Sequence, residues 1–171
     1  IVARFPVSDF SRAALFNDVG LDSSSESDEK IRVNAASNSA GFNYEFTEDS
    51  AFESCFARLP IAADRGRRLM LEVEGDGSEN NFFIIVHDAS GEQHLVMKTL
   101  IAWQGWQEVG VNLEPFLTAP PKMERYLIHW GGDENQTIDF PLTAIDVGVA
   151  KTGSRLQHNG RIGVKAPRVT E

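Results

Sequence analysis

The sequence has a single cysteine and no surplus of basic residues, and both shortages narrow its possible roles. With no second cysteine in the chain, Cys55 cannot form an internal disulfide, so nothing points directly to an oxidising compartment. Lys and Arg number 16 against 25 Asp and Glu, which gives a net charge of −9 at pH 7. This balance disfavours nucleic acid and anionic membranes as partners, because both attract Lys and Arg. A neutral ligand or a cation fits better.

Long apolar runs are also missing. No stretch approaches the ~20 apolar residues of a membrane span, and the opening Ile1-Val2-Ala3-Arg4 is not a signal peptide. The 171 residues suffice to bury one core without disulfides. We therefore expect a single domain over residues 1–171, excised or matured from a larger multidomain protein.

Catalytic patterns are scarce as well. Nucleophilic catalysis needs a Ser, Cys or Thr with a positioned base, and metal hydrolysis needs clustered His and carboxylates; neither is visible. No histidine has another histidine two or four positions away. His87 and His129 are predicted at outward positions near strand ends, as solvent-exposed residues or as hydrogen-bond donors to a sugar. Cys55 follows an apolar strand pattern and is predicted to fill the core.

What the sequence does have is alternation of period two. Between Gly75 and Leu113, apolar runs at residues 82–86, 95–101 and 109–113 predict a strand meander. The first of these runs is apolar on both faces, which predicts a central strand. Asp88 followed by Gly91 predicts a type I turn in which the Asp side chain caps an amide and the Gly takes a positive φ.

The rest of the chain continues this pattern. Residues 31–35 and 42–46 predict a hairpin with one apolar face. Residues 8–30 read as a loop, with a possible short helix over residues 10–16. Further strands are predicted at residues 1–5, 51–59 (ending at Pro60), 69–73, 126–130, 145–149 and 162–169. About ten strands with almost no helical period predict an antiparallel sandwich or barrel.

Several motifs carry a family resemblance. They are Gly75-Asp76-Gly77-Ser78-x-Asn80, Asp88-x-x-Gly91, Gly105-Trp106-x-x-Val109-x-Val111, Pro141-Leu142-Thr143-x-Ile145-x-Val147 and Gly160-x-Ile162-x-Val164. Over roughly the last two thirds of the chain, this order resembles the jelly-roll carbohydrate-binding modules attached to glycoside hydrolases and polysaccharide lyases. The resemblance implies an all-β jelly-roll sandwich that binds a polysaccharide and targets a tethered catalytic domain to it, in a secreted, periplasmic or cell-surface protein. The sugar contacts vary among such modules.

Candidate sugar contacts follow from chemistry, because indole stacks on the apolar face of a sugar while charged and amide groups bond its hydroxyls. Trp103 could either stack on a sugar or pack in the protein, and Trp130 could either pack in the core or contact a ligand. Trp106 is predicted to have a scaffold role at a sheet rim. A second candidate surface consists of outward polar positions, which also suit a merely solvated sheet face. These positions are Arg32, Glu45, Glu72, Glu74, Lys98 and His129, with His87 as a further candidate.

The resemblance also raises the question of one structural calcium ion, held in such modules by an N-terminal carboxylate, backbone carbonyls and an Asp of the final strand. Lys165 and Ala166 occupy the place where that Asp is expected. If calcium is present, it is therefore expected to bind weakly or at another site.

Two other functions stay open. One is a structural β-sandwich domain that packs against a catalytic neighbour without binding sugar. The other is a small lyase or hydrolase on the same fold, which ranks last because no His/Tyr/Arg or carboxylate constellation is apparent.

Overall fold

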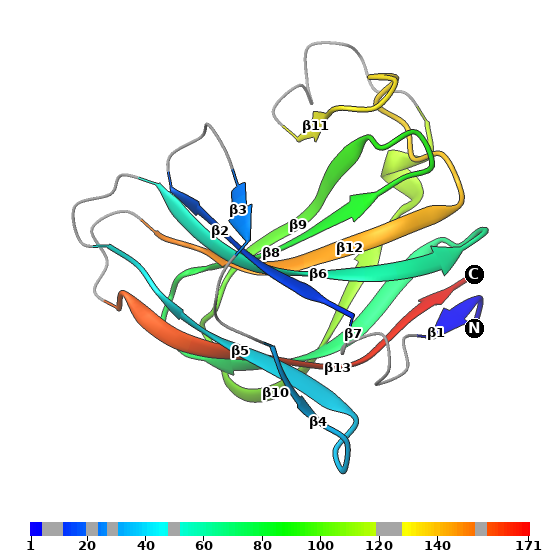
Figure 1. The fold of residues 1–171 in the computed structure, drawn as a ribbon. Helices are drawn as coiled ribbons and strands as arrows, with labels where there is room; N and C mark the ends of the chain where they lie inside the picture. The colour runs from blue at the N-terminus through cyan, green and yellow to red at the C-terminus, as the bar shows by residue number, and fades with distance from the viewer. Residues whose placement is uncertain (5–11, 20–23, 27–30, 48–51, 119–127, 153–156) are drawn as a thin grey trace.

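The protein is an antiparallel β-sandwich, which confirms the predicted all-β class (Figure 1). The computed structural model describes residues 1–4, 12–19, 24–26, 31–47, 52–118, 128–152 and 157–171. Its elements are β1 (Ala3–Arg4), β2 (Ala14–Val19), β3 (Ser24–Glu26), β4 (Arg32–Asn34), β5 (Ser39–Glu45), β6 (Glu53–Ala63), β7 (Arg68–Asp76), β8 (Asn81–His87), β9 (Gln93–Leu100), β10 (Gln104–Asn112), the short 3-10 turn η1 (Glu114–Phe116), β11 (His129–Trp130), β12 (Leu142–Ala150) and β13 (Asn159–Thr170). Across these ranges, no helix has the length and apolar character needed to cross a membrane.

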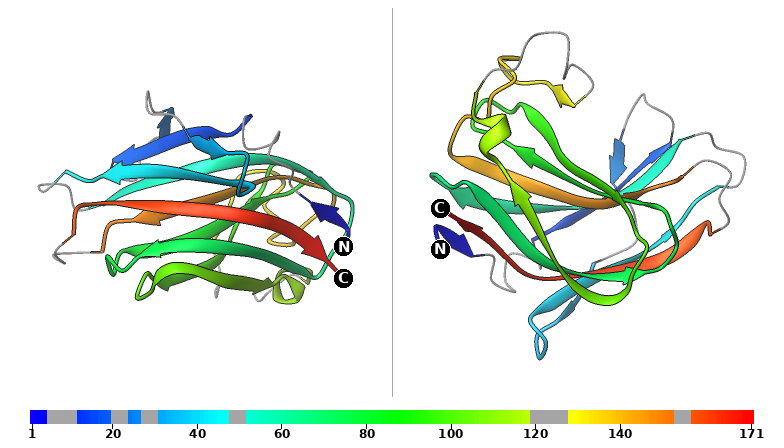
Figure 2. Two further views of the ribbon diagram at one scale, coloured as in Figure 1. Left: turned by 90° about the horizontal axis from the view of Figure 1, so that it is seen from below. Right: turned by 180° about the vertical axis from the view of Figure 1, so that it is seen from behind.

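Two sheets make up the sandwich. The six-stranded sheet has the order β10-β7-β13-β5-β4, with β1 added on β13, and the seven-stranded sheet has the order β11-β9-β8-β12-β6-β2-β3. The last two strands along the chain, β12 and β13, thus lie in the middle of the two sheets, and Figure 2 shows β13 between β5 and β7 from below.

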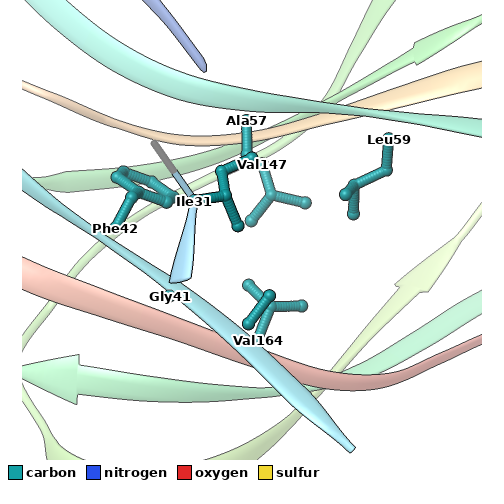
Figure 3. Close-up of a pocket in the computed structure, with 8 residues that line it drawn as sticks. Ile31, Gly41, Phe42, Ala57, Leu59, Val147 and Val164 are labelled. Carbon is teal, nitrogen blue, oxygen red and sulfur yellow. The ribbon is translucent and has the colours of Figure 1, made fainter. Parts of the chain in front are cut away.

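The core lies between the sheets and is built by the predicted alternation. Leu69, Leu71 and Val73 of β7 are fully buried, as are Phe82 and Ile84 of β8. A small apolar pocket remains between the layers, lined from both sheets by residues that include Phe42, Ala57, Val147 and Val164 (Figure 3). No polar side chain lines this pocket, so it offers a ligand nothing to orient it.

Several local predictions are confirmed. β8 lies between β9 and β12, and β4 pairs with β5 as an antiparallel hairpin. The turn after β8 forms as expected: the Gly91 amide donates to the Asp88 carbonyl at 3.1 Å, Asp88 Oδ1 accepts the Ser90 amide at 2.9 Å, and Gly91 has φ 90°. Cys55 is buried in the core.

The predicted meander is wrong in its last step. β8 and β9 pair as a hairpin, but β10 pairs with β7 in the other sheet. The chain crosses between the layers at residues 101–103, where Ile101 is fully buried and the Ile101 amide donates to the Asn80 carbonyl. Three alternating runs fit a meander and a crossover equally well, because alternation reports faces and not partners.

Two segment boundaries also differ from the prediction. The possible helix and the loop predicted over residues 8–30 are contradicted where the structure describes them, since β2 and β3 are strands; residues 5–11, 20–23 and 27–30 lie outside the described part. β6 continues through Pro60 to Ala63. Pro60 is tolerated there because β2 pairs with β6 only as far as Arg58, which leaves the proline on an unpaired side.

Candidate functional site

Trp103 lies at the crossover and is packed at the edge of the core. Its ring meets Phe82 edge to face at 6.2 Å between centroids, and its indole N–H donates to the Val73 carbonyl at 3.2 Å. Gly75 leaves room for it, because a Cβ at that position would lie 2.5 Å from Trp103 Nε1. Of the two roles left open by the sequence, the geometry favours packing for Trp103.

Trp106 is on the edge strand β10, at the predicted sheet rim, yet its side chain is 39% exposed. A Cβ on Gly163 would lie 3.0 Å from Trp106 Cη2. Gly163 is two strands away from Trp106, which is about 10 Å at the usual strand spacing. The indole therefore lies along the outer surface of the six-stranded sheet instead of standing away from it.

The registers place further residues beside this ring. Across the six-stranded sheet, Trp106 is opposite Glu74, Glu74 opposite Gly163, Gly163 opposite Gly41, and Gly41 opposite Arg32. Directly opposite residues of an antiparallel pair share a face. The predicted residues Arg32, Glu45, Glu72 and Glu74 thus lie on one face with Trp106, and we call this outer surface of the six-stranded sheet the Trp106 face (Figure 2, left).

Charges of both signs surround the ring on the Trp106 face. The Lys165 ammonium lies 4.4 Å from the Trp106 ring centroid and 3.8 Å from Glu72 Oε1. Arg168 pairs with Glu108 at 2.9 Å. An exposed ring within mixed charges and without a strong net potential suits a neutral, hydroxyl-rich ligand better than an ion.

The opposite outer surface, on the seven-stranded sheet, receives His87 and Lys98. There Asp146 is fully buried and accepts a bidentate pair of bonds from Arg58 at 2.8 and 3.0 Å and a third from His87 Nε2 at 2.9 Å. Phe56 and Phe83 beside it are buried and packed edge to face. With both Asp146 oxygens engaged and the rings covered, this surface offers little to stack on.

The resemblance motif at Gly75 to Asn80 has a structural role. Asp76 accepts bonds from the Tyr44 hydroxyl at 2.5 Å and the Ser78 amide at 3.0 Å, and Asn80 donates to the Tyr44 hydroxyl at 3.3 Å. Burial, reinforced by the Asp76 hydrogen bond, raises the pKa of Tyr44, so the phenol stays protonated. A Cβ on Gly160 would fall 2.0 Å from Asp76 Oδ2, which explains a glycine there.

The prediction of an outward, exposed His129 is wrong: His129 is 6% exposed and belongs to a buried cluster with His94. The two histidines are directly opposite each other on β11 and β9, and their Nδ1 atoms are 2.6 Å apart. Nε2 of His94 contacts Asp88 Oδ2 at 2.9 Å, and Glu92 lies beside it at 4.0 Å. The adjacent Trp130 is 38% exposed at the edge of the seven-stranded sheet, so the core packing considered for it is not found.

Burial and hydrogen bonds together set the charges in this histidine cluster. Burial raises the pKa of Glu92 to about 7 and lowers the pKa of His94. Burial also acts to raise the pKa of Asp88, but hydrogen bonds from His94, Ser90 and the Asp139 amide outweigh it and lower that pKa. The site therefore holds an ionised Asp88 against a neutral His94.

Short-range spacing along the sequence does not reveal this grouping. His94 and His129 are 35 positions apart, and only the pairing of β9 with β11 joins them. A signal was nevertheless present in Asp88-x-x-x-Glu92-x-His94, where an Asp that opens a turn is followed by an acid and a histidine spaced two apart, the spacing of residues on one side of an extended chain.

Comparison with protein-family models and with curated proteins finds no match to this chain. The two outer surfaces and the buried histidine cluster are therefore the features of the molecule that bear on its function.

Proposed function

We propose that the protein is a non-catalytic carbohydrate-binding module and that the Trp106 face is its binding surface. The observation that carries this proposal is the exposed indole of Trp106, which lies along the sheet among Glu72, Glu74 and Lys165. Such a ring can stack on the C–H face of a sugar, while the charged groups accept and donate bonds to its hydroxyls.

A neutral polysaccharide is the ligand class that fits this face. The ammonium of Lys165 lies over the Trp106 ring and near Glu72. A sugar that displaces the ammonium from the ring can therefore leave the ion pair between Lys165 and Glu72 intact. A strongly charged chain would instead meet groups of its own sign on the same face, at a cost in affinity. The polar groups of an exposed face already form hydrogen bonds with water, so exchanging these for bonds to a sugar adds little to the binding free energy. We therefore expect weak binding at each site.

Weak binding is useful when the module is tethered. A linked polysaccharide-degrading domain would be held at the polymer at an effective concentration set by its linker, without any new contact. This role places the protein outside the cell or in the periplasm. The same proposal includes the hypothesis that calcium, if present, binds weakly or at a site other than the one near Lys165, and this part draws on the family resemblance alone.

The test is affinity electrophoresis of the purified domain in gels containing a panel of soluble neutral polysaccharides. We expect at least one to retard the wild-type protein and Trp106→Ala to abolish the retardation. Loss of a stacking ring is worth about 1–3 kcal/mol, or roughly 5- to 150-fold in affinity. Trp130→Ala is the matched control, because its ring is equally exposed but lies on the other sheet.

The outcomes separate the three functions. A folded wild-type protein with no retardation on a broad panel would contradict the proposal and favour a packing domain. Equal retardation of wild type and Trp106→Ala would keep sugar binding but remove it from this face. Release of reducing ends or unsaturated products by the isolated domain would favour an enzyme.

A further inference from the structure

We infer that Glu92, His94 and His129 form a binding site for a divalent transition-metal ion of the zinc type. One potential ligand atom from each of the three residues lies within 4.8 Å of the others. Among the residues that the structure describes, this is the one grouping of three or more His, Cys, Asp or Glu side chains with that closeness. All three side chains are buried, so the donors face each other and not bulk water.

The tautomer of His94 supports the assignment. Asp88 receives the Nε2 proton of His94, at 2.9 Å, which leaves a lone pair on Nδ1. That lone pair points at His129 Nδ1, 2.6 Å away. A histidine whose second nitrogen donates to a carboxylate is the arrangement that orients metal-bound imidazoles in general. Asp88 is accordingly a positioning residue, fixed by the Ser90 and Glu92 amides.

Without a metal ion, two facing Nδ1 atoms need one proton between them. A bound ion would take the place of that proton between the two Nδ1 lone pairs, and the single proton of His129 would move, by way of solvent, from Nδ1 to Nε2, so that both imidazoles stay neutral. Bonds of ~2.0–2.1 Å to a tetrahedral zinc place two nitrogens about 3.3 Å apart. The histidine rings would separate by less than about 1 Å, and the Glu92 carboxylate, which has an oxygen within 4.8 Å of a nitrogen of each histidine, would move closer to them.

The donor set selects the class of ion. Two imidazoles and one carboxylate suit zinc and its neighbours, whereas calcium prefers six to eight oxygen ligands. Three protein ligands leave a fourth position for water or for an oxygen of a bound molecule. Glu92 also accepts a bond from the Gln136 amide at 3.1 Å. An ion at this site would therefore connect β11 and the loop that follows it to the beginning of β9. This inference does not depend on sugar binding.

The experiment is titration of chelator-treated protein with zinc sulfate by calorimetry, together with cobalt absorption and histidine NMR. We expect one ion per chain with micromolar affinity or better, intense tetrahedral cobalt bands, and shifts of the ring signals of His94 and His129 but not of His87 and His158. Loss of an outer-shell partner alone costs roughly 10- to 100-fold in metal affinity, so His129→Gln and Glu92→Gln should each cost at least that much.

His158→Gln is the matched control. The backbone carbonyl of His158 accepts a bond from the Phe46 amide near the start of β13, and the backbone carbonyl of its neighbour Gln157 accepts one from the Asn80 side chain just before β8. The histidine cluster is at the other end of β8, seven residues or about 23 Å away. This variant should bind zinc as wild type does.

The inference is overturned if wild-type protein binds no zinc, if zinc moves the His87 or His158 signals instead, or if both ligand variants bind zinc with unchanged affinity. The wild-type NMR titration stands on its own if a variant does not fold.

Discussion

Trp103→Ala should lower the free energy of unfolding far more than removal of either exposed tryptophan. Trp103 packs edge to face on Phe82, which is fully buried, and its indole N–H donates to the Val73 carbonyl. Truncation therefore removes ring packing and leaves one backbone carbonyl without that donor. Trp106 and Trp130 are 39% and 38% exposed, so each has less burial to lose.

The magnitude follows from burial. Trp→Ala in a full core costs about 3–5 kcal/mol, and Trp103 is half-buried, so the lower end of about 3 kcal/mol applies, with the lost hydrogen bond included. For a chain of this length each kcal/mol corresponds to about 2–4 °C in Tm. The expected fall is therefore about 6–12 °C, against a few degrees at most for Trp130→Ala.

Urea denaturation followed by circular dichroism measures the free energies, and a thermal scan measures Tm. The control is affinity electrophoresis under native conditions, where Trp103→Ala should still be retarded by any polysaccharide that retards wild type. A loss below about 1 kcal/mol combined with abolished retardation would refute the packing role and make Trp103 the stacking platform.

Two further substitutions test the scaffold. Tyr44→Phe removes a hydrogen bond to the Asp76 carboxylate and should cost about 1.5–3 kcal/mol in urea denaturation, while a cost within error would mean that water replaces the hydroxyl. Gly148→Ala should cost about 1–3 kcal/mol or more, because the new Cβ would lie 2.4 Å from Phe56 Cβ and 2.5 Å from Phe83 Cζ; an unchanged midpoint would show that the rings move aside.

The parts of the fold that sequence predicts are those encoded locally. The alternation at Leu69 to Val73 and at Phe82 to Val86 identifies the buried faces, and the turn at Asp88 follows from one side chain and one positive φ. Such features depend on neighbours two or three positions away, where sequence pattern and structure are directly linked.

The candidate site depends on partners far along the chain, and prediction failed there. Arg32 and Trp106 come to one face only through the order β10-β7-β13-β5-β4, and alternation cannot supply strand order. The alternation within its own strand predicts an exposed His129, whereas pairing of that strand with β9 places His129 against His94 in a buried cluster. Trp106 lies at the predicted sheet rim, but a sequence motif does not show that its ring is 39% exposed there.

The central positions of β12 and β13 bear on how this protein is made. In each sheet the middle strand comes later in the chain than the other described strands, so β8 cannot be joined to β6, nor β7 to β5, until β12 and β13 leave the ribosome. Long-range pairing of this kind must close large loops, and the loss of chain entropy comes before the new contacts stabilise the structure. Folding is therefore slow. Until then the nascent chain exposes unpaired, apolar strand edges, which are prone to aggregate. Synthesis of this domain therefore ends, and does not begin, with the step that makes it a folded protein.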